Sequence, residues 1–402
     1  MGTDLNTKAL LFSTVLVYFS ALANAQYAPS FSWVGDLPGG DTYSDCWGQS
    51  SDGSTAVGTS GGANGYEAYR WTKAGGIQGL GDLAGGSFGS SAFAASKTGS
   101  VIVGQGSSSN GFEAFRWTSA GMSGLGDFSG GDFSSNAYGV SNDGSVVTGF
   151  GSKSAGREAF RWTQATGMVG LGSLSGSTGT SEGKAISGDG QTIVGISSST
   201  GVLGGQAFRW TQAGGMQGLG YLPGGVNIGS EAYGVSLDGS TIVGRGHSSN
   251  GMNEAFRWTA ATGMVGLGDI SGGGFESWAL ATTDDGRMVV GYGTSDIGVE
   301  AMMYEPLNGM RSLSAILTEQ GLASAFAGWT LRTAHGVSIN QFGVPTISGY
   351  AEDSGSHSRA FVAVVPEPAT FFVLGFGLVA LFKRRTKIGS PRSPRLESES
   401  PS

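Results

Sequence analysis

Short runs of alternating apolar and polar residues recur along most of this chain, and turn residues separate them. In a typical unit the runs are residues 232–236, 240–244, 255–259 and 264–268, and Asp238-Gly239 stands between the first two. A period of two residues predicts half-buried β-strands, and Asp-Gly between two such runs predicts a tight hairpin. Each unit therefore predicts a meander of four short strands.

The unit recurs at a nearly constant spacing. Variants of the phrase Phe-Arg-Trp-Thr place aromatic residues 46, 45, 48, 48 and 46 positions apart, at Trp71, Trp117, Trp162, Trp210, Trp258 and Tyr304. Two further phrases, Ser-x-Asp-Gly and Leu-Gly-Asp-Leu-x-Gly-Gly, repeat with the same period and indicate seven copies. Four strands in such a unit are typical of a β-propeller blade. A stacked parallel β-solenoid is the alternative, although its rungs are usually shorter and its ends need caps.

The chain starts and ends within a unit, which predicts how the ring is closed. Residues 33–37 match the fourth strand of a unit, whereas the last unit has only three runs, at 334–338, 346–349 and 360–364. The first strand can complete the last blade and so remove two open edges. We predict an all-β, seven-bladed propeller of four-stranded blades over residues 26–364, closed by its N-terminal strand.

A functional site in a repeat protein is expected where the pattern breaks. The largest insertion is residues 313–331, within which residues 313–321 predict a short helix that ends at Gly321. Smaller breaks fall between the second and third strands of a blade, on one rim of the ring, and loop drift without function is their alternative interpretation. These candidate rim residues are Lys153, Arg157, Arg245, His247 and Asp296.

The repeated residues themselves have structural interpretations. The aromatic series is expected to form core rather than a platform for sugars, because it occurs in almost every unit. The Arg before each Trp needs an ion-pair or carbonyl partner on another strand. The hairpin Asp is expected to close an Asx turn, since a single carboxylate supplies too few ligands for calcium. Cys46 aligns with Ala in other units, which predicts a buried thiol.

Composition narrows the possible functions. Gly contributes 75 of 402 residues without a G-X-Y period, which excludes collagen and disfavours long helices. One Cys and three His exclude a disulfide framework and leave little for a transition-metal site, so we expect no cofactor, no metal and no catalytic constellation. Between residues 26 and 382, 15 basic and 27 acidic residues give a net charge of −12. Nucleic acid is therefore not an expected partner.

The first 25 residues have the features of an export signal. Lys8 precedes an apolar run at 9–22, and Ala23-Asn24-Ala25 stands before Gln26. This order predicts a secretory signal peptide over residues 1–25, cleaved by signal peptidase between Ala25 and Gln26. An N-terminal membrane anchor is the alternative, but the apolar run is short.

The C-terminal segment has the features of a second address. Pro366-Glu367-Pro368 precedes an apolar stretch at 371–382, and Lys383-Arg384-Arg385 follows at once. This order predicts a short helix that anchors the chain transiently in a membrane, with a cytoplasmic basic stop. It resembles, over residues 365–387, the PEP-CTERM sorting signal of Gram-negative exopolysaccharide producers, which implies processing by an exosortase. A Ser- and Pro-rich tail at 388–402 departs from that pattern and is expected to be disordered.

The repeated unit is similar to HAF extracellular repeats. The resemblance is carried by Ala-Phe-x-Trp-Thr, Gly-Met-x-x-Leu-Gly and Ala-x-Gly-Val-Ser-x-Asp-Gly, and it departs at the residue before Ala, where Glu254 and its equivalents stand in place of a frequent His. This resemblance implies an extracellular address and no established activity.

Two functions remain open from the sequence. The first is a non-catalytic structural or interaction protein at the surface or in the matrix of a Gram-negative bacterium, associated with exopolysaccharide or other surface proteins. The second is a glycosidase, lyase or lectin that uses an axial pocket of the propeller. An enzyme needs unique acidic or His residues that converge at the channel mouth, whereas a scaffold predicts a repeated rim.

Overall fold

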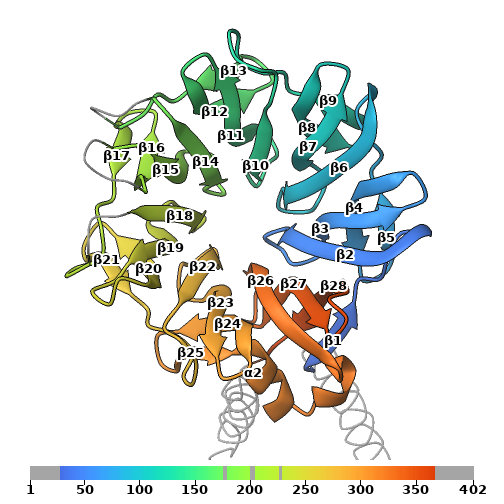
Figure 1. Cartoon of the computed structure of the whole chain (residues 1–402), viewed down its shortest axis with the longest axis vertical. Coiled ribbons are helices and arrows are strands. Elements are labelled where there is room, and N and C mark those ends of the chain that lie inside the picture. The colour runs from blue at the N-terminus through green and yellow to red at the C-terminus, as the bar shows by residue number, and fades with distance from the viewer. Residues whose placement is uncertain (1–27, 175–178, 200–203, 226–228, 367–402) are drawn as a thin grey trace, which may run out of the picture. The chain divides into compact units, whose positions relative to one another are not determined.

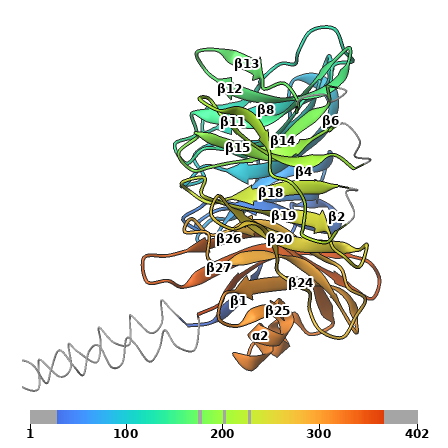
Figure 2. The same cartoon turned by 90° about the vertical axis from the view of Figure 1, so that its left-hand side faces the viewer.

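The chain folds into seven sheets of four strands each, all paired antiparallel. The computed structural model describes residues 28–174, 179–199, 204–225 and 229–366. The sheets are arranged as blades around a central axis, with the first strand of each sheet innermost (Figure 1). Figure 2 shows the blades from the side. The seven-bladed propeller is therefore confirmed, and the parallel solenoid is wrong.

The first four blades follow one another along the chain. Blade 1 comprises β2 (Gly39–Gln49), β3 (Ala56–Gly62), β4 (Gly65–Thr72) and β5 (Gly76–Gly79). Blade 2 comprises β6 (Gly85–Ala95), β7 (Ile102–Ser108), β8 (Gly111–Thr118) and β9 (Gly121–Gly124). Blade 3 comprises β10 (Asn136–Val140), β11 (Val146–Lys153), β12 (Gly156–Thr163) and β13 (Gly167–Gly170). Blade 4 comprises β14 (Ser181–Ile186), β15 (Thr192–Ser197), β16 (Gln206–Thr211) and β17 (Gly215–Gly218).

The last three blades include the strand from the N-terminal end. Blade 5 comprises β18 (Ser230–Val235), β19 (Thr241–His247), β20 (Asn253–Thr259) and β21 (Gly263–Gly266). Blade 6 comprises β22 (Ser277–Thr282), β23 (Val289–Ser295), β24 (Gly298–Glu305) and β25 (Gly309–Ser312). Blade 7 comprises β26 (Trp329–Ile339), β27 (Pro345–Asp353), β28 (Ser358–Val364) and β1 (Ser30–Trp33).

The outer strand of blade 7 is β1, which pairs with β28. Ser30 lies opposite Val364 and Trp33 lies opposite Phe361. The sequence placed this strand at residues 33–37, which is wrong in its bounds. Only Val34 N continues the pairing, to Ala360 O at 3.0 Å. Gly35, with a φ of +83°, then turns the chain out of the extended conformation.

The insertion between blades 6 and 7 contains the predicted helix. It forms α2 (Leu313–Glu319) and the 3-10 turn η1 (Ala323–Phe326), beside β25 at the outer edge (Figure 1). Ser312 Oγ accepts a hydrogen bond from Ala315 N, and Gly321 adopts a φ of +82° after the helix. Leu313 and Leu317 are fully buried in a cluster that also holds residues of β26 to β28. The short helix predicted from 313–321 is therefore confirmed.

The core lies between adjacent blades. Phe256 of β20, for example, packs in one cluster with Val194 and Ala207 of the preceding blade. In six of the seven blades, a buried Ser within or just before the innermost strand adds a polar contact: Ser230 Oγ accepts from Ala207 N at 3.0 Å and donates to Gly220 O at 2.8 Å. The same type of bond joins Ala68 N to Ser90, Ala114 N to Ser135, Ala159 N to Ser181, Ala255 N to Ser277 and Ala360 N to Ser44. These six bonds fix adjacent blades against each other at six of the seven contacts between blades.

Candidate functional site

Every innermost strand carries a β-bulge at the same position of the repeat. In β18 the register shifts between Ala232 and Gly234, so Tyr233 is the extra residue. A bulge re-aims the side chain of the extra residue away from the regular alternation. The seven bulged residues are Trp47, Phe93, Tyr138, Lys184, Tyr233, Leu280 and His335. All seven line one axial cavity of about 450 Å³.

The residue after each bulge is small because the next blade lies close to it. A Cβ on Gly234 would lie 3.1 Å from Leu280 O and 3.1 Å from Ala281 Cα, which is tighter than ordinary packing. The equivalent position in the other six blades also holds Gly or Ala: Gly48, Ala94, Gly139, Ala185, Ala281 and Gly336. The bulged side chain, in contrast, varies from aromatic to cationic.

Four of the bulged side chains form an arc of rings across blades 7, 1, 2 and 3. The ring centroid of Trp47 lies 5.0 Å from that of His335 and 6.4 Å from that of Phe93. The ring of Phe93 lies 5.5 Å from that of Tyr138. Burial lowers the pKa of His335 to about 4, so its imidazole is uncharged at neutral pH. This arc offers aromatic faces to the cavity.

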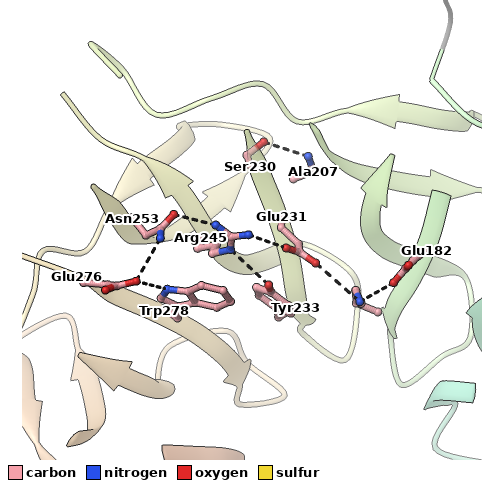
Figure 3. Close-up of polar contacts among 10 residues, drawn as sticks. Glu182, Ala207, Ser230, Glu231, Tyr233, Arg245, Asn253, Glu276 and Trp278 are labelled. Atoms are coloured by element: carbon pink, nitrogen blue, oxygen red, sulfur yellow. Dashed lines mark hydrogen bonds and ion pairs between the residues drawn. The ribbon is translucent and has the colours of Figure 1, made fainter. Parts of the chain in front are cut away.

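A network of alternating charges occupies the next part of the ring (Figure 3). Lys184 Nζ lies 2.7 Å from Glu182 and 3.8 Å from Glu231. Arg245 Nη2 lies 3.2 Å from the other oxygen of Glu231, and Arg157 Nη1 lies 2.7 Å from Glu182. Glu231 therefore stands between two cations, one of which lines the cavity.

Arg245 is held from several directions. Its Nη1 donates to Asn253 Oδ1 at 2.8 Å and its Nε to Tyr233 OH at 3.4 Å. Its guanidinium carbon lies 4.1 Å from the centroid of Trp278. Glu276 Oε1 accepts from Asn253 Nδ2 at 3.2 Å and from Trp278 Nε1 at 3.3 Å. The network is therefore continuous from blade 4 to blade 6, as Figure 3 shows, and Arg157 extends it to blade 3.

An aromatic stack supports this network. The ring of Trp278 stacks on Tyr233 at 5.6 Å and on Tyr292 at 5.3 Å between centroids. Burial raises the pKa of both tyrosines, so their hydroxyl groups stay protonated at neutral pH. Tyr233 thereby presents a neutral hydroxyl and an aromatic ring at the cavity wall.

The charges of the network stabilise one another. Burial disfavours the charged forms of both Glu182 and Lys184. Lys184 and Arg157 outweigh burial at Glu182 and hold its pKa below the usual value. Glu182, Tyr138 and Glu231 likewise hold the pKa of Lys184 above its usual value. Glu182 is therefore ionised at neutral pH and acts as a charge partner rather than a proton donor.

The Ser-x-Asp-Gly turns surround the other end of the cavity. Backbone hydrogen bonds join them from blade to blade, including Lys97 N to Asn142 O at 3.0 Å and Leu237 N to Asp284 O at 3.1 Å. Ser51 Oγ donates to Asn142 Oδ1 at 3.0 Å and so links blade 1 to blade 3. The turns therefore restrain this end of the axis.

Two of the five rim residues singled out in the sequence belong to the axial network, namely Arg157 and Arg245. The sequence placed Arg245 and His247 in one loop and Lys153 and Arg157 in another, which is wrong, because the first two lie within β19 and the other two lie in the facing ends of β11 and β12. Arg245 faces Glu231 across the β18–β19 ladder. His247 Nδ1 lies 3.5 Å from Gly251 O in the following turn.

The other two rim residues, Lys153 and Asp296, are not part of the axial network. Lys153 pairs with Glu158 across its own hairpin, and its Nζ lies 4.4 Å from the ring centroid of Phe128. Asp296 is exposed in the turn between β23 and β24. The structure therefore does not bring these two together with the axial groups that line the cavity.

The repeated aromatic residues lie between blades. Trp71 and Trp162 are buried, and the remaining four are partly buried against the hydrophobic clusters: Trp117, Trp210, Trp258 and Tyr304. In two units the Arg of the same phrase donates to a backbone carbonyl of the next blade, Arg116 to Gly144 O and Arg257 Nε to Gly286 O at 3.1 Å, whereas Arg209 donates to Thr192 Oγ1 of its own blade. Cys46 is a buried free thiol whose pKa is raised by burial.

The repeated acidic residues hold backbone groups. Asp238 Oδ1 accepts from Ser236 Oγ at 2.8 Å and from Ser240 N at 3.0 Å, which is the Asx turn that the sequence predicted. Glu254 Oε1 accepts from Gly268 N at 3.0 Å. Within the described parts of the chain, no group of three or more His, Cys, Asp or Glu residues could hold a metal ion.

The axial residues were not singled out from the sequence. Their signal is the variable position of Ala-x-Gly-Val-Ser, where six residue types occur in seven units while the residues on either side stay small. Alternation along a regular strand does not aim that position at the axis, whereas the bulge does.

The predicted export signal at 1–25, including Ala23, Ala25 and Gln26, lies outside the described residues, as do Glu367, Pro368, the span at 371–382 and the basic stop Lys383-Arg384-Arg385. Pro366 is the last residue described. Across the described ranges, no helix has the length and apolar character needed to cross a membrane.

Comparison with known families identifies the C-terminal address. Residues 364–385 match the model of the PEP-CTERM protein-sorting motif. The motif indicates export and sorting to the surface of a Gram-negative cell, and it implies processing by an exosortase. None of the curated proteins matches the chain.

Solved structures with a similar arrangement are distant in sequence. The β-propeller domain of the Trilobed protease from Pyrococcus furiosus is 10% identical with a TM-score of 0.48, over 80% of this chain and 95% of that one. Acylaminoacyl peptidase from Pyrococcus horikoshii is 10% identical with a TM-score of 0.45, over 86% of this chain and 54% of that one. TolB from Acinetobacter baumannii is 10% identical with a TM-score of 0.40, over 80% of this chain and 63% of that one. None of these similarities carries information about ligand or activity.

Proposed function

We propose that this protein is a surface-sorted, non-catalytic propeller that binds carbohydrate in its axial cavity. The observation that carries the proposal is the ring of bulged side chains, which varies while the rest of each blade repeats. The cavity volume of about 450 Å³ lies within the range of small-molecule sites. Flat aromatic faces suit the C–H faces of sugar rings, and paired charged groups beside them suit hydroxyl groups.

The charged network beside the cavity favours binding over a purely structural role. A scaffold predicts the same side chains in every blade, whereas Lys184, Glu231 and Arg245 are each contributed once. The repeated rim expected for a pure scaffold is therefore not supported by the charged network of blades 4 to 6.

The carboxylates in and beside the cavity favour binding over catalysis. Glu182 and Glu231, beside it, are each held in ion pairs, and the pKa of Glu182 lies below its usual value. Burial raises the pKa of Asp284, as a general acid for glycoside cleavage requires, but Asp284 is the one carboxylate among the described residues that line the cavity, whereas glycoside cleavage uses a pair.

The sorting motif supports a ligand at the cell surface. Residues 365–387 resemble the PEP-CTERM sorting signals of exopolysaccharide producers, and the seven units resemble HAF extracellular repeats. We therefore propose an exopolysaccharide or other matrix glycan as the ligand, and pairing of β1 with β28 as the closure that keeps the ring intact outside the cell.

A glycan screen with the purified exported protein tests the proposal. We expect saturable binding that falls roughly tenfold or more in Trp47→Ala, which removes an aromatic face from the cavity. Phe112→Ala is the matched control, because Phe112 is 59% exposed on β8 and does not line the cavity. Binding of no glycan by the wild-type protein, or equal loss in both variants, would refute the axial site.

A further inference from the structure

Resting on the proposed function, we infer that the axial site selects uncharged glycans and that Glu231 sets this selectivity. Glu231 lies between two cations, 3.8 Å from Lys184, which lines the cavity, and 3.2 Å from Arg245. Its carboxylate cancels positive charge of Lys184 that would otherwise face the ligand. An anionic sugar therefore finds no uncompensated cation in this network.

The charges of the network balance. Its carboxylates are Glu182, Glu231 and Glu276, and its cations are Arg157, Lys184 and Arg245. Three negative and three positive groups give a formal sum of zero. The side chains of Glu231, Lys184 and Arg245 are only 11, 18 and 25% exposed, so water screens a change in this balance weakly.

A neutral sugar suits this arrangement better than a uronate. Its hydroxyl groups can accept from cationic donors and donate to carboxylate oxygens without removing a charge from water. The carboxylate of a uronate that approached Lys184 would also lie near Glu182 and Glu231, and its own desolvation would be poorly compensated because the cations are already paired. Selection of neutral glycans follows from this difference.

The pair formed by Glu231 and Arg245 is specific to blade 5. The two residues face each other across the β18–β19 ladder. The equivalent pairs are Asp45 and Thr59, Ser91 and Gln105, Asn136 and Phe150, Glu182 and Ile196, Trp278 and Tyr292, and Thr333 and Tyr350. All seven blades fold, so the ion pair at this position is not a requirement of the blade.

The test compares neutral oligosaccharides of glucose, galactose and mannose with the oligomeric uronates of the same three sugars. The exported wild-type protein is expected to bind at least one neutral oligosaccharide and to reject the uronates. Glu231→Gln leaves Lys184 and Arg245 with one carboxylate fewer and is expected to gain uronate binding by roughly tenfold or more, with a loss of this gain in high salt.

Two further variants separate the local effect from net charge. Glu319→Gln makes the same charge change on α2, where Glu319 is 62% exposed and pairs with Arg311, and is expected to gain no uronate binding. Lys184→Gln added to Glu231→Gln restores the balance and is expected to abolish the gain. Thermal unfolding shows whether each variant remains folded, and an unfolded Glu231→Gln leaves the wild-type preference as the deciding measurement.

The outcomes separate this inference from the proposed function. Wild-type binding of uronates as tight as that of neutral oligosaccharides overturns the inference and leaves glycan binding standing. A folded Glu231→Gln variant that gains no more uronate binding than Glu319→Gln also overturns it. Failure of the wild-type protein to bind either class overturns both.

Discussion

At the scale of single residues, close approach to the backbone explains much of the glycine content. The Gly of each Val-Gly phrase faces the innermost strand, and a Cβ on Gly244 would overlap with the carbonyl oxygen of Glu231. The equivalent overlap occurs at Gly58, Gly104, Gly149, Gly195, Gly291 and Gly349. These glycines allow the first two strands of every blade to lie close together.

His335 predicts a dependence of stability on pH. Burial lowers its pKa from 6.5 to about 4, so between these values the unfolded state binds more protons than the folded state. Stability is therefore expected to fall as pH falls from 6.5 to 4, by at most about 3 kcal/mol from this residue. Urea unfolding of the wild type and of His335→Leu at several pH values measures this contribution.

Leu is the matched replacement for His335, because blade 6 carries Leu280 at the same bulge. The variant is expected to lose less stability than the wild type over that pH range, while the contributions of the carboxyl groups remain in both proteins. If the free energy of unfolding fell equally with pH in the two proteins, the lowered pKa of His335 would be contradicted.

At the scale of elements, blade 7 depends on a strand from the opposite end of the chain. Phe31 of β1 lies 5.4 Å from the ring of Phe361 and 5.5 Å from that of Phe326. Without β1, the edge of β28 and this aromatic cluster would face water. The β1–β28 pairing therefore carries both hydrogen bonds and apolar burial.

Truncation of the exported protein to begin at Asp36 tests this contribution. Loss of the buried faces of Phe31 and Trp33 is expected to destabilise the propeller by roughly 3–5 kcal/mol and to promote aggregation through the exposed edge. A protein that begins at Ser30 is the control, since it retains all of β1. Equal thermal midpoints for the two truncations would show that β1 does not hold the ring.

At the scale of the whole molecule, one chain carries both a propeller and its sorting motif. The propeller ends at β28, and the PEP-CTERM match begins at residue 364, the last residue of that strand. The sorting motif therefore follows the fold directly, and cleavage after the motif would leave all seven blades intact.

Replacement of Pro366, Glu367 and Pro368 by Ala tests the address. We expect this variant to remain in the membrane fraction with residues 371–402 still attached, because the exosortase no longer acts on the motif. Mass spectrometry of the C-terminal peptides from each cell fraction measures the outcome. Pro391→Ala combined with Pro394→Ala, in the tail, is the control and is expected to be processed as the wild type. Release of the triple variant to the surface would contradict the assignment.

Repetition made the blades predictable, whereas single contacts decided the bounds of individual strands. Alternation, Asp-Gly turns and a constant period indicated four strands in each of seven units. The position of β1 was predicted too late in the chain, because Val34 and Gly35 continue the sequence pattern although Gly35 bends the backbone. The end of β19 was predicted too early, because Arg245 continues the strand through pairing with Ala255.

The sequence by itself determined the number of blades, the short helix near residue 313 and the sorting motif, since each is encoded by a local pattern or a repeat. Only the tertiary structure decided which variable residues meet at the axis. Bulges aim Lys184 and Tyr233 at one cavity, and neighbouring blades bring Glu231 between two cations. Lys184 comes from a different unit than Tyr233 and Glu231, so their proximity depends on the geometry of the ring, which no single repeat contains.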